Sequence, residues 1–253
     1  MFYSLYINFL YEPLYNALIG LSNLLPSHDM GLAIILLTIV VRLVLFPLAK
    51  RSVETQYAMR AMEPALKKIK EEIKDRHEQG AKMLALYREH KVNPLSSILL
   101  LIIQMPIILA LYWVFRGGLE IHPEHLYSFV SEPQGVNTIF LGFLDITAKN
   151  AWLAILVGIT QFFQIRYSLP PVAPKKKERE PSFKEAFARS MHLQMKYILP
   201  PFVAFVSFGI GAAISLYWIT SNLFHLGQEV VIRKRFKLET GVAREENTEA
   251  APG

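Results

Sequence analysis

Long apolar segments alternate with shorter polar ones along this chain of 253 residues. The first apolar run extends from Gly31 to Leu48, and Lys50 and Arg51 close it. A helix of about 20 residues at about 1.5 Å each crosses a hydrocarbon core of about 30 Å, so this run predicts a transmembrane helix over residues 31–49. Several later runs are also too long for a soluble core, and 52% of the chain is hydrophobic. The pattern predicts an all-α, polytopic membrane protein.

Arg42 lies deep within this run, eight residues before Lys50. That separation is about 12 Å along a helix axis, farther than a side chain comfortably reaches to the membrane surface. An ionisable group at such depth normally faces a bundle interior or a water-filled cavity. We therefore expect Arg42, with Thr38 one turn earlier on the same face, to line a hydrated site. The alternative is an arginine neutralised in a dry helix interface that serves packing alone.

The segment before this run, residues 1–30, contains no lysine or arginine but many aromatic residues, and Glu12-Pro13 is expected to break it in the middle. This composition predicts an interfacial helix on the outer face of the membrane. An extra span over residues 14–30 is the alternative. The segment has neither the basic n-region nor the small-residue cleavage site of a secretory signal.

Residues 50–92 are polar and basic, with helical spacing on both sides of a predicted turn at residues 77–80. They predict a cytoplasmic helical hairpin. An Asn cap followed by proline then predicts the start of a second span over residues 94–115. Within that span, Gln104 and Pro106 predict a polar wall position and a local kink.

The next predicted elements are an outer loop at residues 117–150, a third span at 151–169 and a basic cytoplasmic loop at 170–196 that becomes helical towards its end. The apolar part of the outer loop is too short to span. In the third span, the i, i+3 spacing of Gln161 and Gln164 places them on one face.

The last apolar run, from Tyr197 to Leu226, is long for one span and short for two. Lysine and arginine number 11 in residues 50–92, 7 in residues 170–196 and 5 in residues 233–253. Cytoplasmic loops carry such an excess, and the last basic tail joins the others only if this run forms two spans. We therefore predict spans at 197–209 and 211–232 that reverse near the glycines at 209 and 211. The whole chain then has five spans, an outer amino terminus and a cytoplasmic tail at 233–253.

The last span carries a polar stripe, because its polar side chains follow spacings of 3, 4, 3 and 4. The stripe consists of Ser215, Trp218, Asn222, His225 and Glu229. A polar stripe in a span points away from lipid, towards a groove or towards neighbouring helices. Interhelical hydrogen bonding is the simpler interpretation of the stripe alone. Because four predicted spans each offer a polar face, a shared hydrated groove is our prediction.

Motifs of catalysis and nucleotide binding are absent from the sequence. It contains no Gly-rich phosphate loop, no H-E-x-x-H and no nucleophile-elbow serine, so we expect neither an enzyme nor an ATP-driven pump. The chain has no cysteine, which excludes disulfides and thiolate metal sites. His122 and His125 lie in a loop without further ligands, so no metal site is predicted. We expect no cofactor.

Several sequence stretches resemble the YidC, Oxa and Albino-type membrane protein insertases. They are T-I-V-V-R-L-V-L-F-P-L from Thr38, M-x-x-x-x-P-A-L-K-K-I at 59–69, A-L-Y-R-E-H-K-V-N-P-L from Ala85, I-I-Q-M-P-I-I-L-A-L-Y from Ile102 and L-Y-W-I-T-S-N-L-F from Leu216. With their spacing they cover essentially all of residues 31–232, and the chain resembles a short, unlipidated bacterial form.

The resemblance implies five membrane helices around a hydrophilic groove that opens to the cytoplasm and to lipid. Within this groove it places Arg42, Thr38, Trp218 and a glutamine at 161 or 164. It also implies a membrane protein insertase and chaperone in the bacterial cell membrane. The expected partners are nascent membrane proteins and the lipid bilayer, with the Sec translocon as an optional one. The basic tail at 233–237 is expected to contact either the ribosome, through its RNA, or membrane-surface lipids. A channel for ions or small solutes is the rival function, and an assembly chaperone without insertion activity is a third.

Overall fold

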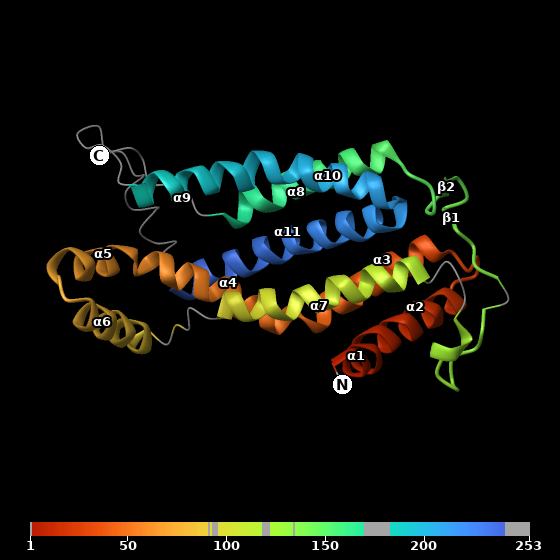
Figure 1. Ribbon diagram of the computed structural model, residues 1–253, viewed down its shortest axis with the longest axis horizontal. Coiled ribbons are helices and arrows are strands. Elements are labelled where there is room, and N and C mark those ends of the chain that lie inside the picture. Colours follow the sequence, from red (N-terminus) through yellow and green to blue (C-terminus); the bar gives the residue numbers. More distant parts are fainter. Residues whose placement is uncertain are drawn as a thin grey trace. The chain divides into compact units, whose positions relative to one another are not determined.

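The computed structural model describes residues 2–90, 92, 96–117, 122–133, 135–169 and 183–240. The chain divides into two compact units, one of Met1–Leu43 with Ile107–Gly227 and one of Val44–Pro106 with Gln228–Gly253. The described residues are mostly helical (Figure 1). Their only strands are β1 (Ile139–Phe140) and β2 (Leu144–Asp145), which pair antiparallel.

Helices make up most of the first unit. They are α1 (Phe2–Tyr6), the π-helical turn η1 (Ile7–Tyr11), α2 (Glu12–Leu24), α3 (Met30–Val44), the 3-10 turn η2 (Pro123–His125), α8 (Ala151–Ser168), α9 (Phe183–Leu193), the π-helical turn η3 (Gln194–Ile198) and α10 (Leu199–Ile210). The second unit contains α4 (Phe46–Ala61), α5 (Glu63–Glu72) and α6 (Arg76–Glu89). Two long helices contribute to both units, α7 (Ser96–Gly117) and α11 (Ala212–Thr240).

The amino-terminal segment is helical from Phe2 to Leu24, so the predicted break at Glu12-Pro13 is wrong. The chain passes the proline by widening into the π-helical turn η1, and Pro13 then lies in the first turn of α2. Proline is tolerated there because the first turn of a helix leaves its N–H groups without intrahelical partners.

Loop residues 122–127 are fastened to α2 by hydrogen bonds. The amide of Asn16 donates to the carbonyl of His125 at 2.8 Å and accepts from the backbone N–H of Tyr127 at 2.7 Å. The hydroxyl of Tyr15, which is fully buried, accepts from the backbone N–H of His122 at 2.8 Å. The Nδ1 atom of His125 also lies 3.2 Å from a carboxylate oxygen of Glu12. The two loop histidines thus take part in anchoring the loop.

The start of α3 is fixed by Asp29, which is buried. One carboxylate oxygen of Asp29 accepts from the backbone N–H of Leu32 at 3.0 Å, and the other accepts from that of Leu141 at 2.8 Å. This contact brings β1 against the first turn of α3. Only glycine fits at position 31, because a Cβ atom there would lie 2.5 Å from the ring of Phe140.

The predicted span over residues 31–49 is not one continuous helix. The helix α3 ends at Val44, and α4 begins at Phe46. Pro47 explains the break, because proline has no N–H to donate to the carbonyl of Leu43 four residues earlier and its ring clashes with that carbonyl.

Few helices of the described residues are apolar enough to span a membrane on composition alone. Arg189–Ile210, with 22 residues, passes by itself, and Met30–Val44 with Phe46–Met59 passes only as a broken pair. Arg189–Ile210 includes the end of α9, all of η3 and α10. The consecutive prolines Pro200 and Pro201 predict an irregular start of this span, but the helix continues through them, and the irregular turn is η3, just before α10.

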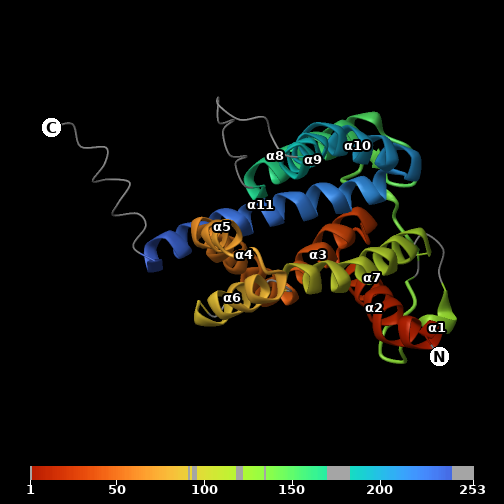
Figure 2. The same cartoon turned by 60° about the vertical axis from the view of Figure 1, so that its left-hand side comes forward.

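Helices α10 and α11 meet at Gly211, where the chain reverses as the glycines predict (Figure 2). The φ angle of Gly211 is 138° and its ψ angle is 170°, a region that is essentially restricted to glycine. The backbone N–H groups of Ala212 and Ala213 donate to the carbonyls of Ala148 and Ile146, each at 3.0 Å. These bonds tie the reversal to the segment that precedes α8.

Replacing Gly211 with alanine should destabilise the chain by about 1–3 kcal/mol, the range for a non-glycine residue held in such a backbone conformation. The cause is strain rather than overlap, since a Cβ atom would lie 3.6 Å from the nearest carbonyl oxygen. Denaturant-induced unfolding in detergent measures the effect. Gly209→Ala is the matched control, because a Cβ atom at Gly209 meets nothing within 4 Å. Equal losses in both variants would contradict this account.

In the second unit, α5 and α6 form a hairpin (Figure 1). Its turn lies at residues 73–75, so the predicted turn at residues 77–80 is wrong, and these residues are part of α6. The reason is a helix cap at Asp75, whose carboxylate accepts from the backbone N–H of His77 at 2.7 Å. The amide of Gln79 donates back to the carbonyl of Ile73 at 3.2 Å and so closes the turn.

Candidate functional site

Arg42 lies on α3 beside the first half of α11. It is half-buried, and its guanidinium donates to the hydroxyl of Ser221, which is buried. It also interacts with the hydroxyl of Tyr217, one turn earlier on α11. Both are neutral groups, and a carboxylate is a stronger acceptor for a guanidinium than a hydroxyl is. An acidic group that reaches Arg42 would therefore compete well for it.

Thr38 lies one turn before Arg42 on α3 and is buried. Its hydroxyl donates to the carbonyl of Ile34 at 2.7 Å. This bond stays within the helix and leaves the oxygen able to accept from another group.

Three residues of the polar stripe of α11 contact two neighbouring helices of the first unit, α8 and α10. The hydroxyls of Ser215 and Ser207 on α10 lie 2.6 Å apart. The amide of Asn222 donates to the hydroxyl of Thr160 on α8 at 3.2 Å. The ring of His225 lies 3.4 Å from the hydroxyl of Ser168 on α8. These contacts are the interhelical hydrogen bonds that were the simpler interpretation of the stripe.

The remaining predicted site residues are not brought together with Arg42 by any hydrogen bond of the described residues. Gln161 donates to Gln164 at 3.1 Å, so the pair is bonded to itself on α8, and both side chains are half-buried. Trp218 is also half-buried. The side chain of Gln104 lies outside the described residues. Glu229, at the end of the stripe, belongs to the second unit and accepts from the hydroxyl of Tyr57 at 2.8 Å.

Two residues that interact with Arg42, Tyr217 and Ser221, were not predicted from the sequence. They are four positions apart, so they share a face of α11 that lies beside the predicted stripe. A serine and a tyrosine at this spacing are common in helices. The signal that singles them out is Arg42 itself, whose charge requires polar partners wherever α11 packs against α3.

A solved structure entitled "Active YidC insertase crystal structure with the first transmembrane domain resolved" is similar to this chain. The TM-score is 0.50 and the identity 25%, over 86% of this chain and 45% of that one. The proteins named "Membrane protein insertase YidC" from Francisella tularensis subsp. novicida (strain U112) and subsp. tularensis (strain SCHU S4 / Schu 4) are each 30% identical over 210 residues. Those residues make up 82% of this chain, which spans only 33% of each relative's length.

A family model described as "60Kd inner membrane protein" matches residues 21–240. The match includes α3, α8, α10 and α11, and therefore Arg42 and the partners described above. It supports a location in a bacterial cell membrane. Since most of the chain is matched, it belongs to the 60Kd inner membrane protein family, which includes the YidC insertases.

Proposed function

We propose that this chain inserts nascent membrane proteins into the bilayer through a hydrated groove at Arg42, without nucleotide hydrolysis or a cofactor. The observation that carries the proposal is the position of Arg42, a charged side chain on an apolar helix whose contacts on α11 are neutral hydroxyls. Membership of the family and the insertases among the similar proteins support it. The sequence offers no catalytic motif, and the proposal requires none.

The proposed topology has five spans, built on α3, α7, α8, α10 and α11. The amino terminus lies outside, the hairpin at residues 50–92 and the loop at 170–196 lie in the cytoplasm, and so does the tail at 233–253. The distribution of lysine and arginine supports this orientation. Several of these helices are less apolar than a typical span because polar side chains such as Asn222 bond to neighbouring helices.

In the proposed mechanism, an acidic residue in the outer segment of a client displaces the hydroxyls from Arg42. Two unit charges about 4 Å apart interact by about 4 kcal/mol at an effective dielectric constant near 20, before desolvation is subtracted. This attraction holds the segment partway across the membrane. Burial of the client's apolar helix in lipid, at about 25 cal/mol per Å², then drives release.

We assign the groove wall to side chains on four of the proposed spans. They are Thr38, Arg42, Gln104, Gln161, Gln164, Ser215, Trp218 and Asn222. The hydrogen bonds of Ser215 and Asn222 to α10 and α8 leave these polar groups satisfied when no client is present. We also propose the ribosome as a partner of the basic tail and the Sec translocon as an optional one.

Insertion into vesicles tests the function against the channel alternative. The purified full chain is reconstituted into phospholipid vesicles, and a ribosome-bound, single-span client is added. The proposal predicts protease protection of the client's outer segment and no ion conductance. Conductance without insertion favours a channel, and binding of the client without insertion favours an assembly chaperone.

A further inference from the structure

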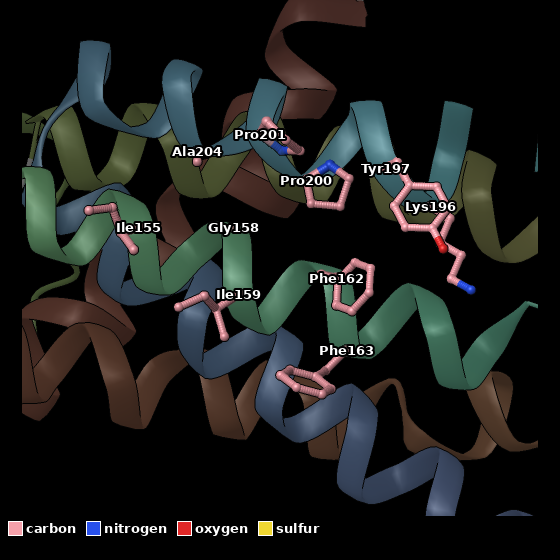
Figure 3. A pocket seen from close by; sticks show the side chains of 10 residues that line it. All are labelled: Ile155, Gly158, Ile159, Phe162, Phe163, Lys196, Tyr197, Pro200, Pro201 and Ala204. Atoms are coloured by element: carbon pink, nitrogen blue, oxygen red, sulfur yellow. The ribbon is translucent and has the colours of Figure 1, made fainter. Parts of the chain in front are cut away.

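A hollow of about 380 Å³ lies between α8 and α10 in the first unit (Figure 3). These two helices pack side by side, and they approach closely at Gly158, where a Cβ atom would lie 3.2 Å from that of Ala204. Beside this contact, apolar side chains from both helices line an open space. Ile155 and Phe163 belong to α8, and Pro200 belongs to α10.

Among the described residues that line the hollow, Lys196 is the only charged one. Figure 3 shows its amino group at one end, beyond the aromatic ring of Tyr197. The Nζ atom lies 5.2 Å from the centre of that ring, a cation–π distance. The salt bridges found in the described part of the chain involve other residues. The amino group of Lys196 therefore lies at one end of a hollow whose other described lining residues are apolar or aromatic.

Apart from Lys196, the described side chains that line the hollow are apolar or aromatic, so the hollow suits an apolar chain that carries an anionic group at one end. Lys196 precedes α10 on the side of the predicted cytoplasmic loop. In the proposed topology, the amino group of Lys196 would lie at the depth of the lipid phosphates of the inner leaflet.

We propose that this hollow binds one acyl chain of an anionic phospholipid, whose phosphate is held by Lys196. The proposal rests on the proposed membrane location of α8 and α10, but not on insertion activity. The apolar walls would take the acyl chain, and Tyr197 would lie at the boundary where amphipathic rings are enriched. A bound lipid would fill the space that side chains leave open between the two helices.

Native mass spectrometry of the full chain in detergent tests the role of charge. The probes are dioleoylphosphatidylglycerol and dioleoylphosphatidylcholine, which share acyl chains and differ in net charge. Lys196→Gln should lower the preference for phosphatidylglycerol about fivefold, the effect of one basic residue near an anionic surface. Arg189→Gln removes the same charge from a residue that does not line the hollow and should leave the preference unchanged. An unchanged preference in Lys196→Gln overturns the proposal.

A second pair of variants tests the hollow itself. Ile155 is 51% exposed and lines the hollow, whereas Leu156 is 45% exposed and does not. Ile155→Trp should fill the space and lower the binding of both lipids, while Leu156→Trp should leave it unchanged. Equal lipid binding in the two variants overturns the proposal. So does a result in which Ile155→Trp affects only a client crosslink or self-association, because another occupant would then fill the hollow. Lipid binding is measured without a client, so its outcome does not depend on whether the chain inserts membrane proteins.

Discussion

Replacing Arg42 with alanine should reduce insertion of a client with an acidic outer segment by about tenfold or more. The expected loss corresponds to about 1.4 kcal/mol, a part of the roughly 4 kcal/mol that the charge pair supplies before desolvation. Removing the guanidinium also leaves the hydroxyl of Ser221 without this donor. The measurement is protease protection of the client in vesicles that contain the purified variant.

Two controls separate charge from packing. Arg42→Lys keeps the positive charge and should retain most of the activity, although it loses the fork geometry of the guanidinium. A client whose outer acidic residues are replaced by asparagine and glutamine should be inserted equally by wild type and Arg42→Ala. If the neutral client lost as much insertion as the acidic one, Arg42 would serve packing alone.

Replacing Asp29 with alanine should lower the free energy of unfolding by about 2–4 kcal/mol, because it removes two hydrogen bonds to a buried carboxylate, one of which caps α3. Asp29 is 2% exposed, and its two oxygens hold the first turn of α3 and the backbone of Leu141. Both N–H groups would be left without this acceptor. Denaturant-induced unfolding in detergent gives the free energy directly.

Asp145→Ala is the matched control for Asp29→Ala. Asp145 also accepts two hydrogen bonds, from the backbone N–H and the hydroxyl of Thr147 at 2.9 and 2.7 Å, but its side chain is exposed. The bonds from Thr147 hold the pKa of Asp145 below its usual value. Because water replaces a lost bond at the surface, the variant should cost less than about 1 kcal/mol. A larger loss in Asp145→Ala than in Asp29→Ala would contradict the role assigned to burial.

The reversal at Gly211 could be predicted from the sequence, and Arg42 could be recognised there as a charge within an apolar helix, because each depends on local chemistry. A charge in an apolar run and a glycine between two apolar segments are visible without knowledge of neighbouring helices. The contacts of the polar stripe, in contrast, could not be predicted from the sequence. Spacing alone places Ser215 and Asn222 on one face of a helix, but the neighbour that this face meets depends on how the helices pack. The structure turns the stripe towards α8 and α10 and brings Ser221 to Arg42.

Helix boundaries were predicted less well because several residues competed to define them. Glycine at position 80 favoured a turn, but the cap at Asp75 set the start of α6 five residues earlier. Pro47 ended α3 within an apolar run that hydropathy treats as continuous. Pro13, in contrast, was expected to break a helix that continues through a π-helical turn. A proline thus ends a helix in one place and is accommodated in another, depending on whether a wider π-helical turn avoids the clash with the carbonyl four residues earlier.

Water access to the surroundings of Arg42 decides whether the proposed groove is hydrated. The chain has no cysteine, so a single cysteine reports on one position alone. Cysteine is introduced at Ser221, beside Arg42, and at two controls on α3, buried Leu37 and the 47% exposed Val40. In membrane vesicles, we expect a charged, membrane-impermeant thiol reagent added on the cytoplasmic side to modify position 221 and neither control. If position 221 reacted no faster than position 37, the site would be dry, and the proposed groove would be contradicted.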